Sequence, residues 1–197
     1  MRYADDLIIC CRYQRDAERI KIALGRCLAK YGLKINESKT RLVQFSKRKQ
    51  KQGEQQQTFD FLGFTFYIGK SRKGYYLIKV KTAGKRIRSK PKKVNDWARR
   101  IRNKKSLKEI IEIAAAKVRG HIQYYGVSHN VPTMQSFLCV VNKILFKWLN
   151  RRSQRKSFTW EKFQLFLDRM AFQKAKSVTN YSNPWVNVNV FILSLLL

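Results

Sequence analysis

A stretch of 36 residues in the middle of the chain, residues 70–105, contains sixteen lysines and arginines and one acidic residue, Asp96. The whole chain of 197 residues carries a formal net charge of +31, from 43 basic and 12 acidic residues. Such an excess of like charge weakens a compact fold unless a polyanion neutralises it. Single salt bridges cannot offset this density, whereas phosphate groups can. We therefore expect nucleic acid as the main partner, and an anionic membrane surface is the alternative.

The composition still allows a folded chain, since 44% of the residues are hydrophobic and 13% are aromatic. The four cysteines, at positions 10, 11, 27 and 139, show no C-x-x-C spacing and lie far from both histidines. We expect reduced thiols and no zinc site. The apolar stretch at residues 190–197 is much shorter than the roughly 20 residues of a spanning helix, and no signal peptide opens the chain. We expect a soluble, intracellular protein with no membrane partner, cytoplasmic in a bacterium or located in an organelle.

The first 45 residues alternate between strand and helix patterns. Residues 7–11 are a short apolar run typical of a buried strand. Apolar residues then recur at three- and four-residue steps over residues 16–31, with acidic residues in the first turn and Gly32 just past the end. This pattern predicts an amphipathic helix. Residues 33–35 and 42–45 are expected to be short strands, and the whole order predicts an α+β layer.

The rest of the chain changes from strand to helix patterns near Pro91, a residue suited to a first helical turn. Before it, residues 47–57 are expected to be an exposed loop. Residues 59–67 predict a strand with a bulge or close backbone approach at Gly63, and residues 75–81 predict another strand. Helices are predicted over residues 94–101, 107–125, 137–149 and 160–170, which indicates a small helical bundle.

The last 27 residues differ from everything before them. Residues 180–185 have the composition of a turn, and residues 186–197 end in an apolar run. The sequence suggests no role for this tail. We interpret it as more typical of a shortened or shifted reading frame than of a designed element.

Five short motifs carry a resemblance to a known family. The first three, in chain order, are Tyr3-Ala4-Asp5-Asp6, Gly32-Leu33-Lys34-Ile35-Asn36-Glu37-Ser38-Lys39-Thr40 and Phe61-Leu62-Gly63-Phe64. Their order and spacing resemble the palm of reverse transcriptases. The last two are Arg119-Gly120-His121-Ile122-Gln123-Tyr124-Tyr125-Gly126 and Lys147-Trp148-Leu149-Asn150-Arg151-Arg152. They resemble the maturase-specific helical region of proteins encoded by group II introns. From residue 2 to residue 170, the chain therefore resembles the C-terminal part of a group II intron reverse transcriptase/maturase.

The resemblance implies an α+β fold in which a partial reverse-transcriptase palm is followed by a small helical thumb and maturase bundle. On this basis residues 1–68 would form the partial palm, with the Tyr-Ala-Asp-Asp motif and a primer-grip-like strand. Residues 69–90 would form a basic strand and linker, residues 91–170 the helical thumb and maturase-specific region, and residues 171–197 the atypical tail.

The palm resemblance implies a site for two Mg²⁺ ions, one favouring the attacking 3′-hydroxyl as an alkoxide and one holding the triphosphate. Asp5 and Asp6 would be the catalytic, metal-binding carboxylates, with Asp5 as the direct ligand. Tyr3 and Ala4 would shape the turn and the floor beneath the primer end. The alternative for this motif is an exposed acidic turn.

Two further palm features follow from the same resemblance. Lys39 matches a catalytic lysine near the incoming triphosphate, where it would neutralise pyrophosphate or donate a proton; plain surface charge is the alternative. The primer grip would correspond to Phe61, Leu62, Gly63 and Phe64, with Gly63 allowing close approach of the backbone. An ordinary buried strand is the alternative for both phenylalanines.

Charge and resemblance together imply an RNA-binding surface, because structured RNA offers shape and backbone phosphates more than readable base edges. His121 has no carboxylate or second histidine near it in the sequence, so we expect it to contact RNA or to be structural, and not to be catalytic. Tyr124 and Tyr125 are expected to be core and capping residues rather than base-stacking platforms. The candidate RNA-binding residues are Lys85, Arg86, Arg88, Lys90, Lys92, Lys93, Arg99, Arg100, Arg119, His121, Arg151 and Arg152.

By resemblance, the expected function is that of the distal part of an RNA-directed DNA polymerase that binds group II intron RNA, promotes its splicing and supports DNA synthesis on an RNA/DNA primer-template. A palm also needs another metal-binding aspartate and the fingers, and we expect these, and the first strand of the hairpin bearing residues 3–6, to precede Met1. Alone, such a fragment would be inactive as a polymerase. An upstream polypeptide could restore activity by pairing with the exposed edge of residues 7–11. The alternative is a non-catalytic RNA-binding maturase remnant.

Overall fold

The chain folds into two compact units, Met1–Val80 with Ser182–Leu197 and Lys81–Tyr181. The computed structural model describes residues 2–3, 6–38, 40–45, 57–152, 158–170 and 172 and the backbone of residues 190–196. Helices and antiparallel sheets are combined, so the predicted α+β fold class is confirmed. In this described part of the chain, no helix is both long and apolar enough to cross a membrane.

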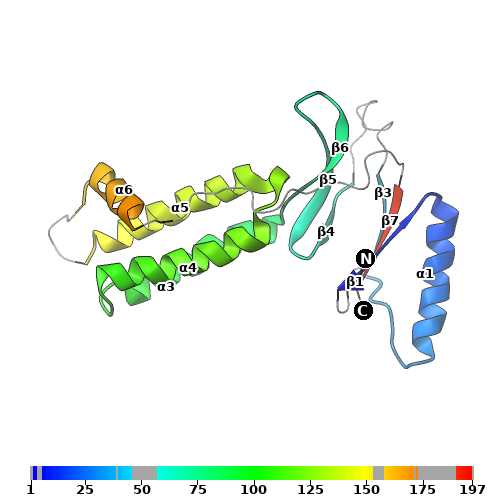
Figure 1. The fold of residues 1–197 in the computed structure, drawn as a ribbon. Coiled ribbons are helices and arrows are strands. Elements are labelled where there is room, and N and C mark those ends of the chain that lie inside the picture. Colours follow the sequence, from blue (N-terminus) through cyan, green and yellow to red (C-terminus); the bar gives the residue numbers. More distant parts are fainter. Residues whose placement is uncertain are drawn as a thin grey trace. The chain divides into compact units, whose positions relative to one another are not determined.

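The first unit contains a four-stranded antiparallel sheet in the order β1-β2-β7-β3 (Figure 1). Its strands are β1 (Arg2–Tyr3), β2 (Asp6–Cys11), β7 (Val190–Leu196) and β3 (Arg41–Phe45). Strand β7 lies between β2 and β3 and pairs with both; Ile8, for example, is opposite Ser194. The sheet therefore combines the two ends of the sequence.

This sheet corrects two expectations and limits a third. The apolar run in the tail has a structural role, as a central strand of this sheet. Strand β7 covers one edge of residues 7–11 along their whole length, and on the other edge the pairing described with β1 reaches only Leu7, so the edge that was expected to be open is limited to the β1 side. The hairpin also has a first strand, since Tyr3 of β1 pairs with Asp6. A sequence pattern identifies an apolar strand but does not specify which distant strand it pairs with.

Helix α1 (Gln14–Ala29) lies alongside this sheet (Figure 1). Gly32, with a φ of 70°, follows the helix in the left-handed conformation that the sequence predicted for a helix end. The predicted strand at residues 33–35 is wrong. The amide of Leu33 instead closes the helix end by donating to the carbonyl of Leu28 (3.0 Å), so the amide is used by the helix cap and not by a strand.

A three-stranded sheet, in the order β4-β5-β6, completes the first unit. Its strands are β4 (Phe59–Phe61), β5 (Phe64–Lys70) and β6 (Tyr76–Thr82). The predicted single strand over residues 59–67 is therefore wrong, since it is a hairpin. Leu62 and Gly63 both have positive φ (49° and 79°), the backbone pattern of a two-residue type I′ turn.

Aromatic rings fill the core of the first unit. Phe45 of β3 meets Phe59 of β4 edge to face, with ring centroids 5.6 Å apart, and Phe59 stacks on Phe66 of β5 at 4.9 Å. Ile8 of β2 and Ile78 of β6 are buried in the same cluster. The core therefore connects the two sheets and anchors β2 two residues beyond Asp6.

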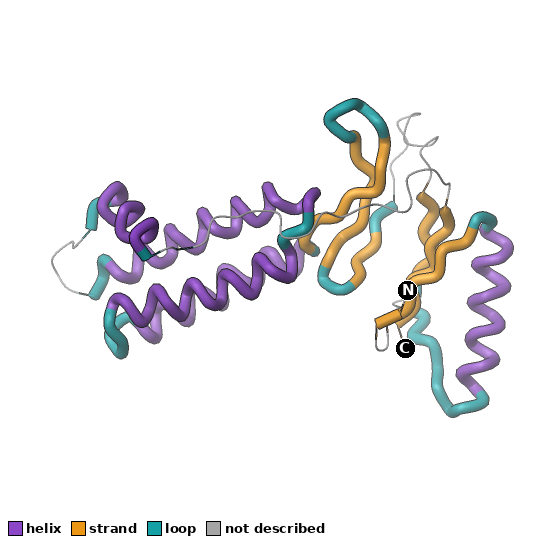
Figure 2. The backbone as a smooth tube through the Cα atoms, in the orientation of Figure 1, coloured by secondary structure: helices purple, strands orange, loops and turns teal. Residues whose placement is uncertain are grey.

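Beyond Thr82, the described segments of the second unit are helices joined by short loops (Figure 2). They are α3 (Gly84–Ile101), α4 (Leu107–Tyr125), the short 3-10 helix η1 (Ser128–Asn130), α5 (Val131–Leu149) and α6 (Trp160–Arg169). Figure 1 shows α3, α4 and α5 side by side. Their buried residues form one apolar cluster with α6. The three predicted helices that follow residue 105 are present, and α5 begins at Val131, six residues before the predicted start.

Helix α3 begins at Gly84, seven residues before the predicted start at Pro91. A proline inside a helix removes one backbone hydrogen bond and costs about 3 kcal/mol. The helix continues through this position because Ile87 before it and Val94, Trp97 and Ile101 after it all pack against the apolar cluster. Tertiary packing thus outweighs the local signal, and the basic residues 85–90 lie on a helix instead of in a linker.

Polar side chains fix the start of α4 and the junction between α4 and α5. Helix α4 begins with a capping box: the Glu109 amide donates to the Ser106 Oγ (3.3 Å), and the Ser106 amide donates to the Glu109 Oε2 (2.9 Å). At the junction of α4, η1 and α5, Asn130 is fully buried and bonds both Thr82 and the Tyr125 carbonyl. These bonds hold the start of α3 near the α4–α5 turn.

Candidate nucleic-acid interface

The predicted catalytic carboxylates lie at the start of β2. Asp6 is the first residue of that strand, is partly buried and pairs with Tyr3, which is 65% exposed. Ala4 and Asp5 lie outside the described residues. Among the residues that are described, no three His, Cys, Asp or Glu side chains gather where they could hold a metal ion. A two-magnesium site needs several oxygen ligands, and among the described donors Asp6 would supply one part of such a site.

Lys39 also lies outside the described residues, but the loop around it is partly described. The carbonyl of Asn36 accepts hydrogen bonds from the amide and the hydroxyl of Thr40, both at 2.9 Å. The Ser38 hydroxyl donates to the Asn36 Oδ1 at 2.7 Å. Asn36 thus organises this loop.

The residues of the primer-grip-like motif form the turn of the β4–β5 hairpin. Phe61 is buried in the core, whereas Leu62, Gly63 and Phe64 are partly exposed. Phe61 therefore belongs to an ordinary buried strand, which was the alternative to a primer contact. Contact of the other three with a primer stays a prediction.

The two cysteines of β2 are poor nucleophiles. Burial raises the pKa of the Cys10 thiol to about 11 and also raises the pKa of Cys11. All four cysteines of the chain are free. In the core of the first unit these thiols act as small apolar side chains.

The basic residues of α3 form an exposed stripe on the side of the helix away from the core. Lys85, Lys92 and Arg99 are seven residues apart, which places them above one another at two-turn intervals, and all three are exposed. Ala98 and its partly buried apolar neighbours occupy the opposite side. The other basic candidates on α3 are also exposed: Arg86, Arg88, Lys90, Lys93 and Arg100.

No carboxylate neutralises these charges within the described part of the chain. The ion pair of this unit that the structure records there joins Lys105 to Glu109 (3.8 Å), beyond the end of α3. Asp96 is the one acidic residue of the helix. An unpaired row of cations repels itself, and phosphate groups would relieve the repulsion.

A second group of cations surrounds Trp148 near the end of α5. The guanidinium of Arg102 lies 5.1 Å from the centre of the indole, the ammonium of Lys147 5.3 Å and the guanidinium of Arg151 5.6 Å. The indole N–H donates to the Asn95 Oδ1 at 2.8 Å, which fixes the ring. Cation–π contacts contribute about 0.5–1 kcal/mol each at exposed sites. The indole thus holds three cations together in one patch.

The remaining basic candidates differ in their surroundings. Arg119 on α4 is exposed. Arg152 donates from its guanidinium to the carbonyl of Lys105 (3.0 Å), so this side chain joins the end of α5 to the α3–α4 turn. Of the two tyrosines expected to be core and capping residues, Tyr125 is buried, whereas Tyr124 is 54% exposed and lies outside the core.

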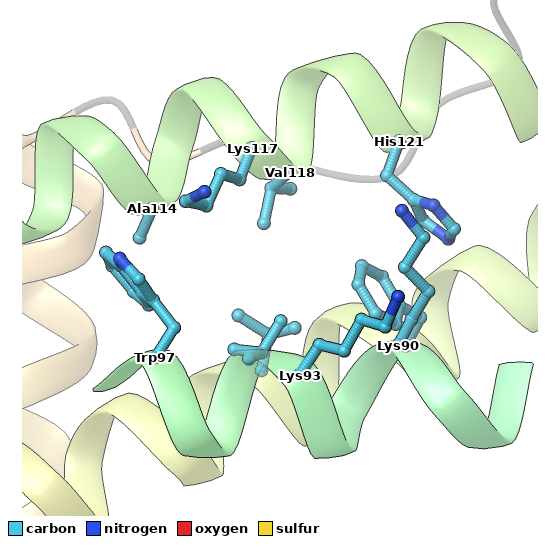
Figure 3. Close-up of a pocket in the computed structure, with 10 residues that line it drawn as sticks. Lys90, Lys93, Trp97, Ala114, Lys117, Val118 and His121 are labelled. Carbon is cyan, nitrogen blue, oxygen red and sulfur yellow. The ribbon is translucent and has the colours of Figure 1, made fainter. Parts of the chain in front are cut away.

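A pocket of about 260 Å³ lies between α3, α4 and α5. Its apolar wall includes Trp97 and Val118, and three exposed lysines stand around it. Figure 3 shows Lys90 and Lys93 of α3 reaching toward the ring of His121, while Lys117 of α4 reaches toward Trp97. The ammonium of Lys117 lies 5.6 Å from the centre of that indole. The pocket therefore combines aromatic surface with positive charge.

His121 lines this pocket and is only 6% exposed. Its ring contacts those of Tyr125 and Phe137, with centroids 4.6 and 4.2 Å apart. Burial and, secondarily, the charge of Lys90 lower the pKa of His121 to about 4, so the ring is neutral at pH 7. Neither ring nitrogen has a hydrogen-bond partner among the described residues.

Sequence reasoning did not assign a ligand-binding role to the two tryptophans or to Lys117. Both Trp97 and Trp148 are apolar positions in helical patterns, which is why they were expected only in the core. One signal was available: Arg151 follows Trp148 by three residues, a spacing that brings side chains together on a helix. The pocket itself depends on three helices meeting and has no local sequence signal.

Two family models match the chain. A model described as reverse transcriptase (RNA-dependent DNA polymerase) matches residues 1–66, and a model of the group II intron maturase-specific domain matches residues 87–166. No curated protein and no solved structure matches it. The two matches follow one another in the order of the five motifs and confirm the resemblance inferred from them.

Proposed function

Because the chain belongs to the family of group II intron reverse transcriptases and maturases, we propose that its second unit binds the structured RNA of such an intron and assists its folding and splicing. The observation that carries the proposal is the exposed row of cations on α3, which has no carboxylate partner in the described part of the chain. The cluster of three cations on Trp148 supports it.

The physical basis is the exchange of counterions for protein cations. Each lysine or arginine that contacts a phosphate releases a condensed counterion, and this gain in entropy stabilises the complex. The double-helical parts of folded RNA are recognised through shape, phosphates and 2′-hydroxyls, since their major groove is too narrow for side chains. Lys85, Lys92 and Arg99, which rise along one side of a helix, suit contacts with a backbone of regularly spaced phosphates.

The proposal is tested by measuring the affinity of the full chain for a folded group II intron RNA in a filter-binding assay. The test variant carries Lys85→Gln, Lys92→Gln and Arg99→Gln together. A matched control removes the same net charge from α1 of the first unit. It carries Arg15→Gln, Arg19→Gln and Arg26→Gln.

We expect the α3 variant to bind about tenfold more weakly or worse at 100 mM salt, because it loses three phosphate contacts. The affinity of the α1 control should fall by less than about threefold. The control loses the same long-range electrostatic attraction as the α3 variant but no direct phosphate contact. Equal losses for the two variants would mean that only the total charge matters and that α3 is not the binding surface.

The match of residues 1–66 to a reverse transcriptase supports a second function, template-primed DNA synthesis. We propose Asp5 and Asp6 as ligands of Mg²⁺, which when bound would favour the attacking hydroxyl as an alkoxide. Lys39 would neutralise the triphosphate. Asp6 is the only described carboxylate at the start of β2, so further oxygen ligands, with fingers and another aspartate, would have to complete the site from outside this sequence.

Primer extension on an RNA template with Mg²⁺ tests this second function. The 197-residue polypeptide alone should extend no primer, because on this proposal Asp5 and Asp6 do not complete the metal site by themselves. A strand supplied from outside this sequence would pair on the β1 side of β2, because β7 occupies the other edge along the whole strand. Robust extension by the polypeptide alone that Asp5→Ala abolishes would contradict the need for a partner.

A further inference from the structure

We propose that the pocket between α3, α4 and α5 captures one unpaired nucleobase of the bound RNA, with the adjoining phosphate held by Lys90 and Lys93. This inference rests on the proposed function, since it names how the second unit would contact its RNA. It adds a site that recognises an unstacked base to a surface that otherwise contacts only the backbone.

The walls of the pocket suit a flat ring. Trp97 lies on one side and His121 on another, and small aliphatic side chains such as Val118 line the space between (Figure 3). The ring of Phe137 also lines the pocket and contacts that of His121. Unpaired bases in RNA are commonly recognised by stacking on aromatic side chains. Pockets for drug-sized ligands have volumes of about 300–1,000 Å³. At about 260 Å³ this one suits a single base better than a larger ligand.

The polar atoms of the pocket point to a ligand with both donors and acceptors. The ring of His121 is 94% buried, neutral at pH 7 and without a hydrogen-bond partner for either nitrogen in the described structure. A neutral imidazole offers one donor and one acceptor. The edge of a nucleobase carries donors and acceptors side by side, so it can satisfy a buried group that an aliphatic side chain would leave unpaired.

The charges around the pocket select an anion. Lys90, Lys93 and Lys117 are exposed at its rim, and none of the residues lining it is acidic. A nucleotide places its phosphate one sugar away from its base, so a base held in the pocket brings a phosphate to the rim. An apolar peptide side chain would fill the same walls but would leave three lysines unused.

The test compares RNA hairpins that share one stem. Four of them carry a single bulged A, C, G or U, and the fifth is fully paired. The affinity of the full chain for each is measured by fluorescence anisotropy at one salt concentration. The quantity of interest is the ratio of each bulged affinity to the paired affinity, because backbone contacts to the stem cancel in that ratio.

We expect the ratio for at least one bulged base to be about tenfold or more, as for one stacked base. His121→Phe should bring that ratio to about one, since phenylalanine keeps the ring contacts and removes both nitrogens. Lys108→Gln is the matched control, because Lys108 is exposed on the same helix and does not line the pocket; it should leave the ratio unchanged. If His121→Phe does not fold, Lys90→Gln with Lys93→Gln at exposed positions should lower the ratio instead.

Other outcomes distinguish a failure of the pocket proposal from a failure of the proposed RNA binding. If the chain binds the paired hairpin and all four ratios are near one, the pocket proposal is overturned while RNA binding by the second unit stands. If no hairpin binds, both proposals fail. If the four nucleoside 5′-monophosphates bind as tightly as the best bulged hairpin, and His121→Phe abolishes that binding, the pocket takes a free nucleotide and its assignment to RNA is wrong.

Discussion

The side chain of Asn130 organises one end of the second unit. It is fully buried, accepts a hydrogen bond from the Thr82 amide (2.9 Å) and donates to the Thr82 hydroxyl and the Tyr125 carbonyl (2.8 Å each). The substitution Asn130→Ala removes all three bonds. The Tyr125 carbonyl keeps the Val127 amide as a donor at 2.8 Å. The buried amide of Thr82 is therefore the group left without a partner.

The expected loss of stability follows from these bonds. The two bonds donated by Asn130 contribute about 1 kcal/mol each, and a buried N–H without a partner costs about 1–3 kcal/mol. We expect Asn130→Ala to lower the free energy of unfolding of the second unit by about 3–5 kcal/mol. Since 1 kcal/mol shifts the Tm of a domain of this size by about 4–8 °C, the Tm should fall by at least about 12 °C.

Calorimetry of the full chain, together with urea unfolding followed by tryptophan fluorescence, measures this loss. Asn103→Ala is the matched control, because Asn103 lies exposed in the turn after α3. The control should stay within about 0.5 kcal/mol of the unmodified chain. If Asn130→Ala is equally mild, the hydrogen bonds of Asn130 do not hold this corner and the reasoning is refuted.

Two further predictions concern stability. The pKa of His121 in the folded chain, about 4, lies below its ordinary value near 6.5, so its neutral ring contributes stability that is complete above pH 6.5 and is lost as the pH falls towards 4. Between pH 7 and pH 5, this group should therefore lower the free energy of unfolding, measured by urea titration, by at most about 2 kcal/mol. His121→Phe should remove this part of the pH dependence. An unchanged pH dependence in that variant would contradict the assigned cause. The other charged or titratable groups that face the ring or the pocket beside it are Lys90, Lys93, Lys117 and Tyr125. Separately, Ser106→Ala should cost about 1 kcal/mol by removing the N-cap of α4, whereas Ser136→Ala, at an exposed position within α5, should cost less than about 0.5 kcal/mol.

Local patterns predicted the helical unit well. The apolar spacing of α4 and α5 and the glycine after α4 are properties of neighbouring residues, so they can be recognised without a partner. The start of α3 could not be predicted in this way. Pro91 is a strong local signal, but the packing of Ile87 and Val94 on the apolar cluster, which depends on α4 and α5, decides the outcome.

In the first unit, the strands could be predicted from the sequence but their pairing could not. The strand patterns of β2 and β3 were recognisable, but the strand between them comes from the other end of the chain, and pairing over that distance leaves no local trace. The hairpin at Leu62 and Gly63 was hidden because apolar residues stand on both sides of a two-residue turn. The pocket at His121 was out of reach for the same reason as β7, since its walls come from three helices.

The salt dependence of RNA binding tests the central claim most directly. The affinity of the full chain for a folded group II intron RNA is measured between 50 and 200 mM monovalent salt. If the cations of the second unit make at least six phosphate contacts, the affinity should fall by about a thousandfold across this range. A nearly flat salt dependence would show that phosphate contacts do not drive binding and would contradict the proposed function.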